Sequence, residues 1–421
     1  MIIDFTVSNF RSIKNEQTFS MYSENKTEHL ADNIVFPSGE KIGVLKTAGI
    51  YGANASGKSN LLLAFHALSY LTFGSGDLKE GDPIPSYEPY LLSSETKSAA
   101  INFEVEFALQ GNRYIYKVSY NKEKVISESL DYYPGTQPAN IFNRAPGQSW
   151  KEITFGTHYK GGKKRIAFFE NNTYLSKAGN SADAPVIIRD IYRYFRTGII
   201  HIGVEDEVKS HDWKKDERLV NAVSLAVQNI DLGIQGFEFR EKDMSEFKFP
   251  SNMPEKIKQR FIDDFGQETL FHHYSEDGEF ALISENSESA GTMRFFHLMP
   301  LALTAIKTGA TLIFDELEKH LHPHIAEIII RLFQDPTVNT KMAQLIFSTH
   351  NVSLMSPELL RRDQIWFAQK DNGATSVYSL DEYDRSTVKN TSPFGKWYDE
   401  GRFEAIPRLN YAAIASALKD E

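Results

Sequence analysis

The sequence predicts an α/β fold in which a β-rich lobe accompanies a lobe built on a parallel sheet. A short β-compatible segment at 46–51 leads through a glycine-containing stretch at 52–59 into an apolar run with helical spacing. Segments between 100 and 130 alternate polar and apolar residues with a period of two, which predicts an antiparallel meander. From about residue 298 onward, helical and strand patterns alternate, as in βα units.

Helical patterns at 186–195 and 219–227 predict an insertion between these two regions, and residues 236–285 return to short strands and a charged helix. No heptad repeat is sustained along the chain, so a long coiled coil is not expected.

The composition excludes several classes of protein. The chain has 421 residues, of which 41% are hydrophobic, and this is enough for a sizeable core. It has no cysteine, which excludes disulfides, thiolate metal sites and a cysteine nucleophile. Its net charge of −10 argues against a nucleic-acid binder that is basic all over, although a local basic groove stays open.

The N-terminal residues alternate polar and apolar side chains and lack the basic and apolar regions of a signal peptide. No run approaches the ~18 apolar residues that a membrane span needs. We therefore expect a cytoplasmic protein without membrane contact.

The stretch at 50–65 contains the spacing Gly52-x-x-x-x-Gly57-Lys58-Ser59, which is typical of a phosphate-binding loop. Glycine lets backbone N–H groups turn inward around phosphate oxygens, where a Cβ would block the approach. Lys58 would place a positive charge on the β and γ phosphates, and the Ser59 hydroxyl would hold Mg²⁺. The alternative is a glycine turn ahead of a helix. The nucleotide-binding residues expected from this stretch are Gly52, Asn54, Ser56, Gly57, Lys58, Ser59 and Asn60.

Two later strands are expected to carry reactive side chains to one edge of the parallel sheet. The buried apolar run at 310–314 ends in Asp315, which suits Mg²⁺, and Glu316, which suits the attacking water. The run at 343–347 precedes His350, and parallel pairing would bring this imidazole to the same edge. The alternative is that the acids merely close a strand and that the histidine is structural.

The segment at 288–294 precedes a helix, and its Ser289 and Gly291 could bind an anion as a second phosphate cradle. An ordinary N-capped helix is the alternative. The three histidines at 320, 322 and 324 surround a proline, so a helix start is expected there in preference to a metal site.

Two further patterns are interpreted as having no nucleotide or nucleic-acid role. The basic cluster at 159–165 fits a solvated hairpin turn better than a nucleic-acid contact. The sequence Asn-Lys-Glu-Lys at 121–124 lacks the aspartate of a guanine-reading motif, so GTP selectivity is unsupported.

Together these motifs resemble those of ATP-binding-cassette-type ATPases of the SMC/RecF group. They are similar to the AAA-type, OLD-like and RloA- or AbiL-like ATPases of bacterial phage-defence systems. The resemblance covers nearly the whole chain. It rests on the first strand with Val7-Ser-Asn-Phe-Arg11, the Walker A loop, the signature Ser289-Ala-Gly-Thr-x-Arg294, the Walker B pair Asp315-Glu316, and the switch sequence Ser348-Thr-His350-Asn.

This resemblance implies a single ATPase head that binds ATP and Mg²⁺. Its parts would be an N-terminal lobe at 1–135, an inserted segment at 136–285 and a C-terminal lobe at 286–421. Catalysis would use Glu316, Lys58 and His350. Arg11 would join the nucleotide-binding residues, and Ser289 and Gly291 would bind ATP in trans. The signature lacks the Leu-Ser-Gly-Gly-Gln of transporters, and no Q-loop glutamine is assigned.

The resemblance also implies a homodimer or higher homo-oligomer that closes over ATP. OLD-like proteins carry a C-terminal nuclease with Asp-x-Asp ligands, whereas only about 70 residues follow His350 and no Asp-x-Asp occurs. We therefore expect a sensor that controls a separate effector, with a nuclease as the first candidate and nucleic acid as a further partner. The alternatives are a DNA-repair or DNA-binding relative of SMC and RecF, and an ATP-binding scaffold with negligible turnover.

Overall fold

The computed structural model describes residues 1–23, 29–37, 42–203, 212–230, 233–242, 249–250, 252–406, 411 and 415–416. Its contacts divide the chain into two compact units. The first comprises Met1–Val204, Ile306–Leu317 and Ile330–Glu421, and the second comprises Glu205–Ala305 and Glu318–Ile329. The division of the chain at 135 and 285 stays a prediction.

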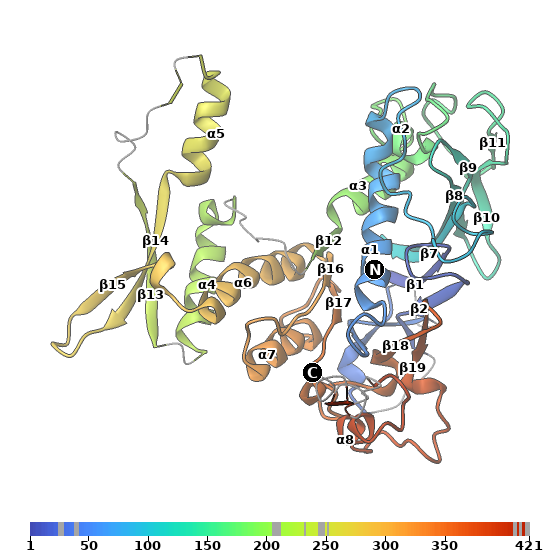
Figure 1. Ribbon diagram of the computed structural model, residues 1–421. Helices are drawn as coiled ribbons and strands as arrows, with labels where there is room; N and C mark the ends of the chain where they lie inside the picture. Colours follow the sequence, from blue (N-terminus) through green and yellow to red (C-terminus); the bar gives the residue numbers. More distant parts are fainter. Residues whose placement is uncertain are drawn as a thin grey trace. The chain divides into compact units, whose positions relative to one another are not determined.

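The first unit contains a seven-stranded sheet in the order β11-β10-β9-β8-β7-β1-β2 (Figure 1). All its pairs are antiparallel, and β7, β8 and β9 form the predicted meander. Its strands are β1 (Ile2–Ser8), β2 (Gln17–Ser20), β7 (Ile101–Leu109), β8 (Asn112–Tyr120), β9 (Val125–Tyr133), β10 (Ala139–Arg144) and β11 (Thr154–Phe155).

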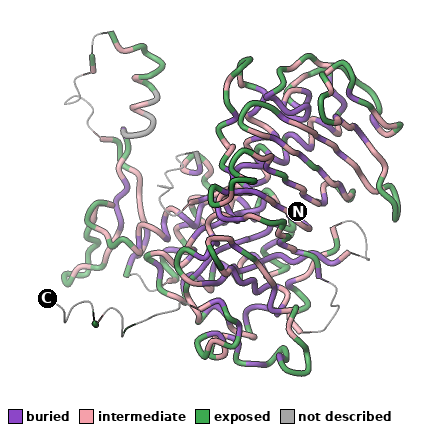
Figure 2. Tube along the Cα trace, turned by 45° about the vertical axis from the view of Figure 1, so that its right-hand side comes forward, coloured by how far each residue is buried: buried purple, intermediate pink, exposed green. Residues whose placement is uncertain are grey.

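A six-stranded sheet in the order β12-β16-β17-β6-β18-β19 lies in the same unit. Its strands pair in parallel except for the antiparallel hairpin of β18 and β19. The strands are β6 (Thr47–Tyr51), β12 (Ile199–Ile202), β16 (Thr311–Phe314), β17 (Gln344–Ser348), β18 (Ile365–Asp371) and β19 (Ala374–Ser379). Every residue of β6, β16 and β17 is buried, as Figure 2 shows for the centre of this unit.

Helix α1 (Lys58–Ser69) shares one hydrophobic core with both sheets. Phe65 of α1 stacks on Phe5 of β1 with ring centroids 4.0 Å apart, and its edge meets Phe19 of β2. Phe19 in turn contacts Trp366 of β18 at 5.0 Å. The predicted α/β class, with one β-rich sheet and one largely parallel sheet, is confirmed.

Three further helices belong to the first unit: α2 (Tyr174–Gly179), α3 (Val186–Thr197) and α8 (Phe394–Asp399). A small antiparallel sheet in the order β3-β5-β4 consists of β3 (Tyr22–Ser23), β5 (Gly43–Leu45) and β4 (Ile34–Val35). α3 buries Ile188, Ile191 and Phe195, which leaves its charged residues on the opposite face.

The second unit contains the antiparallel sheet β13 (Ile234–Glu241), β14 (Gln267–Tyr274) and β15 (Phe280–Ser284). Phe296 of α6 (Ala290–Thr308) packs edge-on against Phe237 and Phe271 of this sheet. Its helices are α4 (Glu217–Gln228) and α5 (Glu255–Phe265). Two helices cross the division between the units, α6 and α7 (Pro323–Gln334).

Candidate functional site

The predicted phosphate-binding loop joins the end of β6 to the start of α1, as the strand-loop-helix pattern requires. Gly57 has φ 110° and Gly52 has φ 149°, which are values that favour glycine. A Cβ on Gly57 would lie 2.1 Å from the Thr375 hydroxyl, and one on Gly52 would lie 2.3 Å from the Ala368 carbonyl. Glycine is therefore required at both positions, at Gly52 by the backbone of β18 and at Gly57 by the Thr375 side chain of β19.

Lys58, the first residue of α1, is 5% exposed. Its ammonium donates to the carbonyls of Gly52 at 2.9 Å and Ala53 at 3.0 Å, so the side chain lies back across its own loop. Ser59 is half-buried and Asn54 is exposed at the tip. The arrangement leaves a helix N-terminus facing the loop, where its dipole favours an anion.

A series of side-chain hydrogen bonds supports the loop. Asn60 Nδ2 donates to Ser12 Oγ at 2.6 Å, and Ser12 Oγ lies 2.8 Å from Thr375 Oγ1. Thr375 Oγ1 donates to the Ser56 carbonyl at 2.8 Å. Arg11 joins through a bond to Asn60 Oδ1 at 3.1 Å. The predicted residues Arg11, Ser56 and Asn60 are thus brought together, whereas Ser12 and Thr375 were not predicted.

A cavity with a volume of about 560 Å³ opens beside these hydrogen-bonded residues. Its walls include Arg11, Asn60, Tyr87, Tyr90 and Lys370. Glu88 also lines it and accepts from Arg11 Nε at 2.6 Å. The cavity has the volume, the aromatic walls and the few charged groups that small-molecule sites usually show.

The predicted acidic pair follows β16, and the predicted histidine follows β17, its parallel neighbour. The Ser348 hydroxyl donates to the Asp315 carboxylate and accepts the Glu316 N–H at 2.8 Å. His350 Nε2 lies 4.0 Å from Glu316 Oε1. Glu316 has φ 54°, an uncommon conformation for a non-glycine residue and one that occurs at functional sites.

Ser348 links the two strand ends, and its role was not predicted. β17 also pairs with β6, so the strand that carries Ser348 lies between the loop strand and the acidic strand. The oxygen donors of Ser59 and of Asp315, which is 5% exposed, are of the type that Mg²⁺ prefers.

The C-terminal region contacts the loop through a bond that was not predicted. Ala53 N donates to the Ala405 carbonyl at 3.0 Å, and the Tyr398 hydroxyl donates to the same carbonyl at 3.1 Å. Burial, with Asp399 nearby, raises the pKa of Tyr398 to about 12, so this donor keeps its proton. Gly395 of α8 packs on Val352, two residues beyond His350, where a Cβ would approach Val352 at 2.9 Å.

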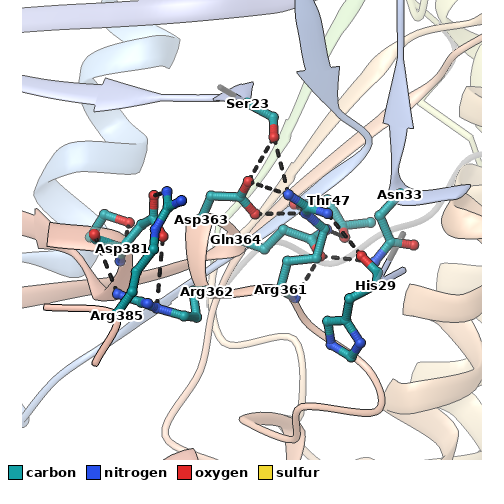
Figure 3. Close-up of polar contacts among 11 residues, drawn as sticks. Ser23, His29, Asn33, Thr47, Arg361, Arg362, Asp363, Gln364, Asp381 and Arg385 are labelled. Carbon is teal, nitrogen blue, oxygen red and sulfur yellow. Dashed lines mark hydrogen bonds and ion pairs between the residues drawn. The ribbon is translucent and has the colours of Figure 1, made fainter. Parts of the chain in front are cut away.

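A buried polar cluster holds the base of the loop strand (Figure 3). Gln364 Nε2 donates to Thr47 of β6, at 2.8 Å to its carbonyl and 2.6 Å to its hydroxyl. Arg361 donates through Nε and a terminal nitrogen to both carboxylate oxygens of Asp363, at 2.9 and 2.8 Å. Ser23 Oγ donates to Asp363 at 2.7 Å. Because Thr47, Gln364 and Arg361 are buried, the bonds fix the register of β6.

The predicted signature residues belong to the second unit. Ser289 Oγ accepts the Thr292 N–H at 3.1 Å and so caps the start of α6. Gly291 lies against the His320 carbonyl, where a Cβ would approach to 2.8 Å. The capping alternative is therefore realised, and the trans role of Ser289 and Gly291 stays a prediction.

The remaining sequence motifs show structural roles. α7 begins at Pro323, which confirms the helix start expected among the three histidines. No metal-binding group of three ligands occurs among the described residues. The basic cluster at 159–165 lies in a loop between β11 and α2, so it is not a hairpin turn, and its residues 160–165 are exposed. Tyr159 is buried, and its hydroxyl lies 2.6 Å from that of Tyr174. Within the described part of the chain, no helix has the length and apolar character to cross a membrane.

A phosphate-type loop between a strand and a helix of a largely parallel sheet, with acidic side chains at a nearby strand end, defines a P-loop nucleotide-binding protein. The chain belongs to the family described as "AAA domain, putative AbiEii toxin, Type IV TA system", whose model matches residues 48–356. This match confirms the predicted relationship to AAA-type ATPases. The comparison with curated proteins gives no match.

Three solved structures are similar to this chain. An SMC head bound to the C-terminal winged-helix domain of ScpA is 14% identical, covers 90% of this chain and 97% of its own, and has a TM-score of 0.45. The SMC head domain from Thermotoga maritima is 15% identical, covers 90% of this chain and 98% of its own, and has a TM-score of 0.39. The recombination mediator RecF with ATP, from the RecFOR pathway, is 14% identical, covers 83% of this chain and 92% of its own, and has a TM-score of 0.35.

We expect Tyr398→Phe to weaken ATP binding about fivefold, because one buried hydrogen bond that supports the loop, worth about 1 kcal/mol, is lost. Binding of a fluorescent ATP analogue to the full chain measures this. Tyr274→Phe, on a side chain that is 66% exposed in the second unit, is the matched control and should bind as the wild type does. Equal affinities for both variants would show that the C-terminal contact does not support the loop.

Proposed function

We propose that this protein hydrolyses ATP and uses the resulting change of state to control a separate effector. The observation that carries the proposal is the placement of the loop, the acidic pair and the histidine on three adjacent strands of one sheet, β6, β17 and β16. Parallel pairing directs their carboxyl ends to one edge, where nucleotides bind in folds of this kind. The family match supports nucleotide binding.

In the proposed mechanism, Lys58 exchanges its two loop carbonyls for the β and γ phosphates. Ser59 and Asp315 would hold Mg²⁺, which neutralises charge on the phosphate oxygens. Ser348 keeps the Asp315 carboxylate oriented through its hydroxyl. Glu316 polarises the attacking water, and His350, 4.0 Å away, responds to the γ phosphate.

The 560 Å³ cavity is the proposed seat for the base and ribose. It adjoins the loop through Asn60, the third residue of α1, and Arg11 stands between them. A nucleotide whose phosphates lie at the helix start can extend its sugar toward the aromatic walls at Tyr87 and Tyr90. The sequence carries no guanine-reading motif, so ATP is the proposed nucleotide.

A second copy of the chain would complete the site through Ser289 and Gly291. The first cradle already supplies donors for one triphosphate, so a second donor set at the start of α6 suits the phosphate of another molecule. Closure of two copies over ATP gives two states, and a partner that prefers one state is regulated by linkage. The family description, which names a toxin and a toxin–antitoxin system, supports a role in phage defence.

We expect Lys58→Ala to lose nucleotide binding, because the phosphate charge loses its partner, whereas Glu316→Gln should bind ATP and stall before hydrolysis. Steady-state phosphate release and ATP-analogue binding measure the two effects. Lys122→Ala and Glu123→Gln, in an exposed turn, are matched controls. Wild-type turnover by Glu316→Gln would refute the role of Glu316, and negligible turnover by the wild-type protein would favour a scaffold.

We expect Ser289→Arg to keep ATP binding and to block hydrolysis, because a bulky cation would occupy the seat of the partner's phosphate. Mixing it equally with Lys58→Ala should restore about a quarter of the wild-type rate, since half the dimers are mixed and each has one intact site. Ser289→Ala controls for the lost helix cap, worth about 1 kcal/mol. Absence of recovery in every mixture would contradict completion in trans.

The regulatory role predicts that the chain protects cells only together with a neighbouring gene. Phage plating on cells that express the chain alone, the neighbour alone or both tests this, because the proposed role places the effector on another protein. Glu316→Gln co-expressed with the neighbour is the control for dependence on hydrolysis. Full protection by the chain alone would rule out a separate effector.

A further inference from the structure

A second cavity of the first unit lies away from the loop, between the end of α2 and one face of α3. Its volume is about 490 Å³, and its walls include Arg189, Arg193, Arg196 and Tyr192 of α3. A neighbouring hollow of about 310 Å³ shares two of its lining residues, Asn180 and Ser181. We call the two together the α3 groove.

The α3 groove is rich in positive charge. Its larger part is lined by three arginines and by no carboxylate, and its smaller part adds Lys177 and one acid, Asp77. The arginines are spaced four and three residues apart, so they lie on one face of the helix. The α3 groove is therefore lined by positively charged side chains although the chain has a net charge of −10.

The neighbouring loop adds to this charge. Lys163 N donates to the Asp183 carbonyl at 2.7 Å, which holds the basic loop at 160–165 beside the segment that leads into α3. Between residues 160 and 196 the sequence has eight Lys and Arg against three Asp and Glu. The surface around the groove is consequently basic although the protein is acidic.

One guanidinium in the groove has an unmet hydrogen-bonding requirement. Arg189 Nε is buried and has no hydrogen-bond partner among the described residues. A buried donor without a partner costs free energy that an incoming acceptor would recover. Arg193 is bonded to Asp190 at 2.9 Å, yet its side chain remains 66% exposed and can receive a second acceptor.

We propose that the α3 groove binds an acidic segment of a partner protein, at a site separate from the nucleotide. Arginine recognises carboxylates with two parallel hydrogen bonds, and arginine and tyrosine are the residue types that dominate binding energy at interfaces. The apolar side chains of Phe73 and Ile166 in the smaller part suit a peptide that alternates acidic and apolar residues.

A nucleic acid fits the same surface less well. A phosphodiester strand carries a negative charge on every residue and would meet Asp77, Asp183 and Asp190 around the groove. A peptide can place its few carboxylates on the arginines and keep uncharged residues beside these acids.

The test is fluorescence anisotropy with the full chain and a labelled eight-residue peptide that alternates glutamate and leucine. We expect binding that weakens as salt is added, and no binding of the same peptide with glutamine in place of glutamate. Replacing Arg189, Arg193 and Arg196 with glutamine should reduce the affinity at least about tenfold. The matched control removes the same charge from exposed turns, with glutamine at Lys97, Lys122 and Lys124.

Two results would overturn the proposal. One is an equal loss of peptide affinity in the groove variant and in the control, or no binding of the glutamate peptide to the wild type. The other is that a 20-nucleotide single strand binds about ten times more tightly than the peptide and that the groove variant abolishes this binding. Thermal unfolding and ATP-analogue binding of the groove variant check its fold. Since peptide binding requires no turnover, the result is independent of ATP hydrolysis.

Discussion

The burial of α1 against both sheets is the constraint on which the nucleotide site depends. A backbone cradle binds phosphate well only if its N–H groups are already oriented, because reorientation would consume the binding free energy. Phe65 fixes the helix against Phe5 and Phe19, and Phe19 continues the contact to Trp366 in the second sheet. The loop is thereby held between a buried strand and a buried helix, and only its tip is exposed.

A buried polar cluster fixes the position of β6 at the end of the strand away from the loop. Thr47 and Gln364 are fully buried, and their hydrogen bonds permit one register between β6 and the chain entering β18. A buried ion pair such as Arg361 with Asp363 adds little net stability after desolvation, and its value lies in rejecting alternative pairings. A one-residue shift of β6 would displace Gly52 and Gly57 from the backbone contacts that require glycine.

The sequence predicts those parts of the fold and site that depend on local patterns. The loop, α1, β16 and β17 follow from residue spacing and apolar runs, and their polar ends meet because parallel strands share an edge. β12 was missed because four residues, Ile199–Ile202, give too short a pattern beside a long helical one. The contacts of Thr375 and Ala405 were missed because they join the loop to positions more than 300 residues away. The role of Ser348 was missed because its hydroxyl bonds both residues of the acidic pair across two neighbouring strands, which no local pattern indicates.

The strand order also constrains the time at which the site can exist during synthesis. β6 is neighboured by β17 and β18, which begin at Gln344 and Ile365, about 290 and 310 residues after β6 ends at Tyr51. At translation rates of roughly 5–20 residues per second, the loop strand waits about 15–60 s on the ribosome for its partners. The nascent N-terminal sheet can form early, while the candidate nucleotide site matures only after β17 and β18 have been synthesised. Nucleotide binding by this loop is therefore delayed relative to formation of the antiparallel sheet.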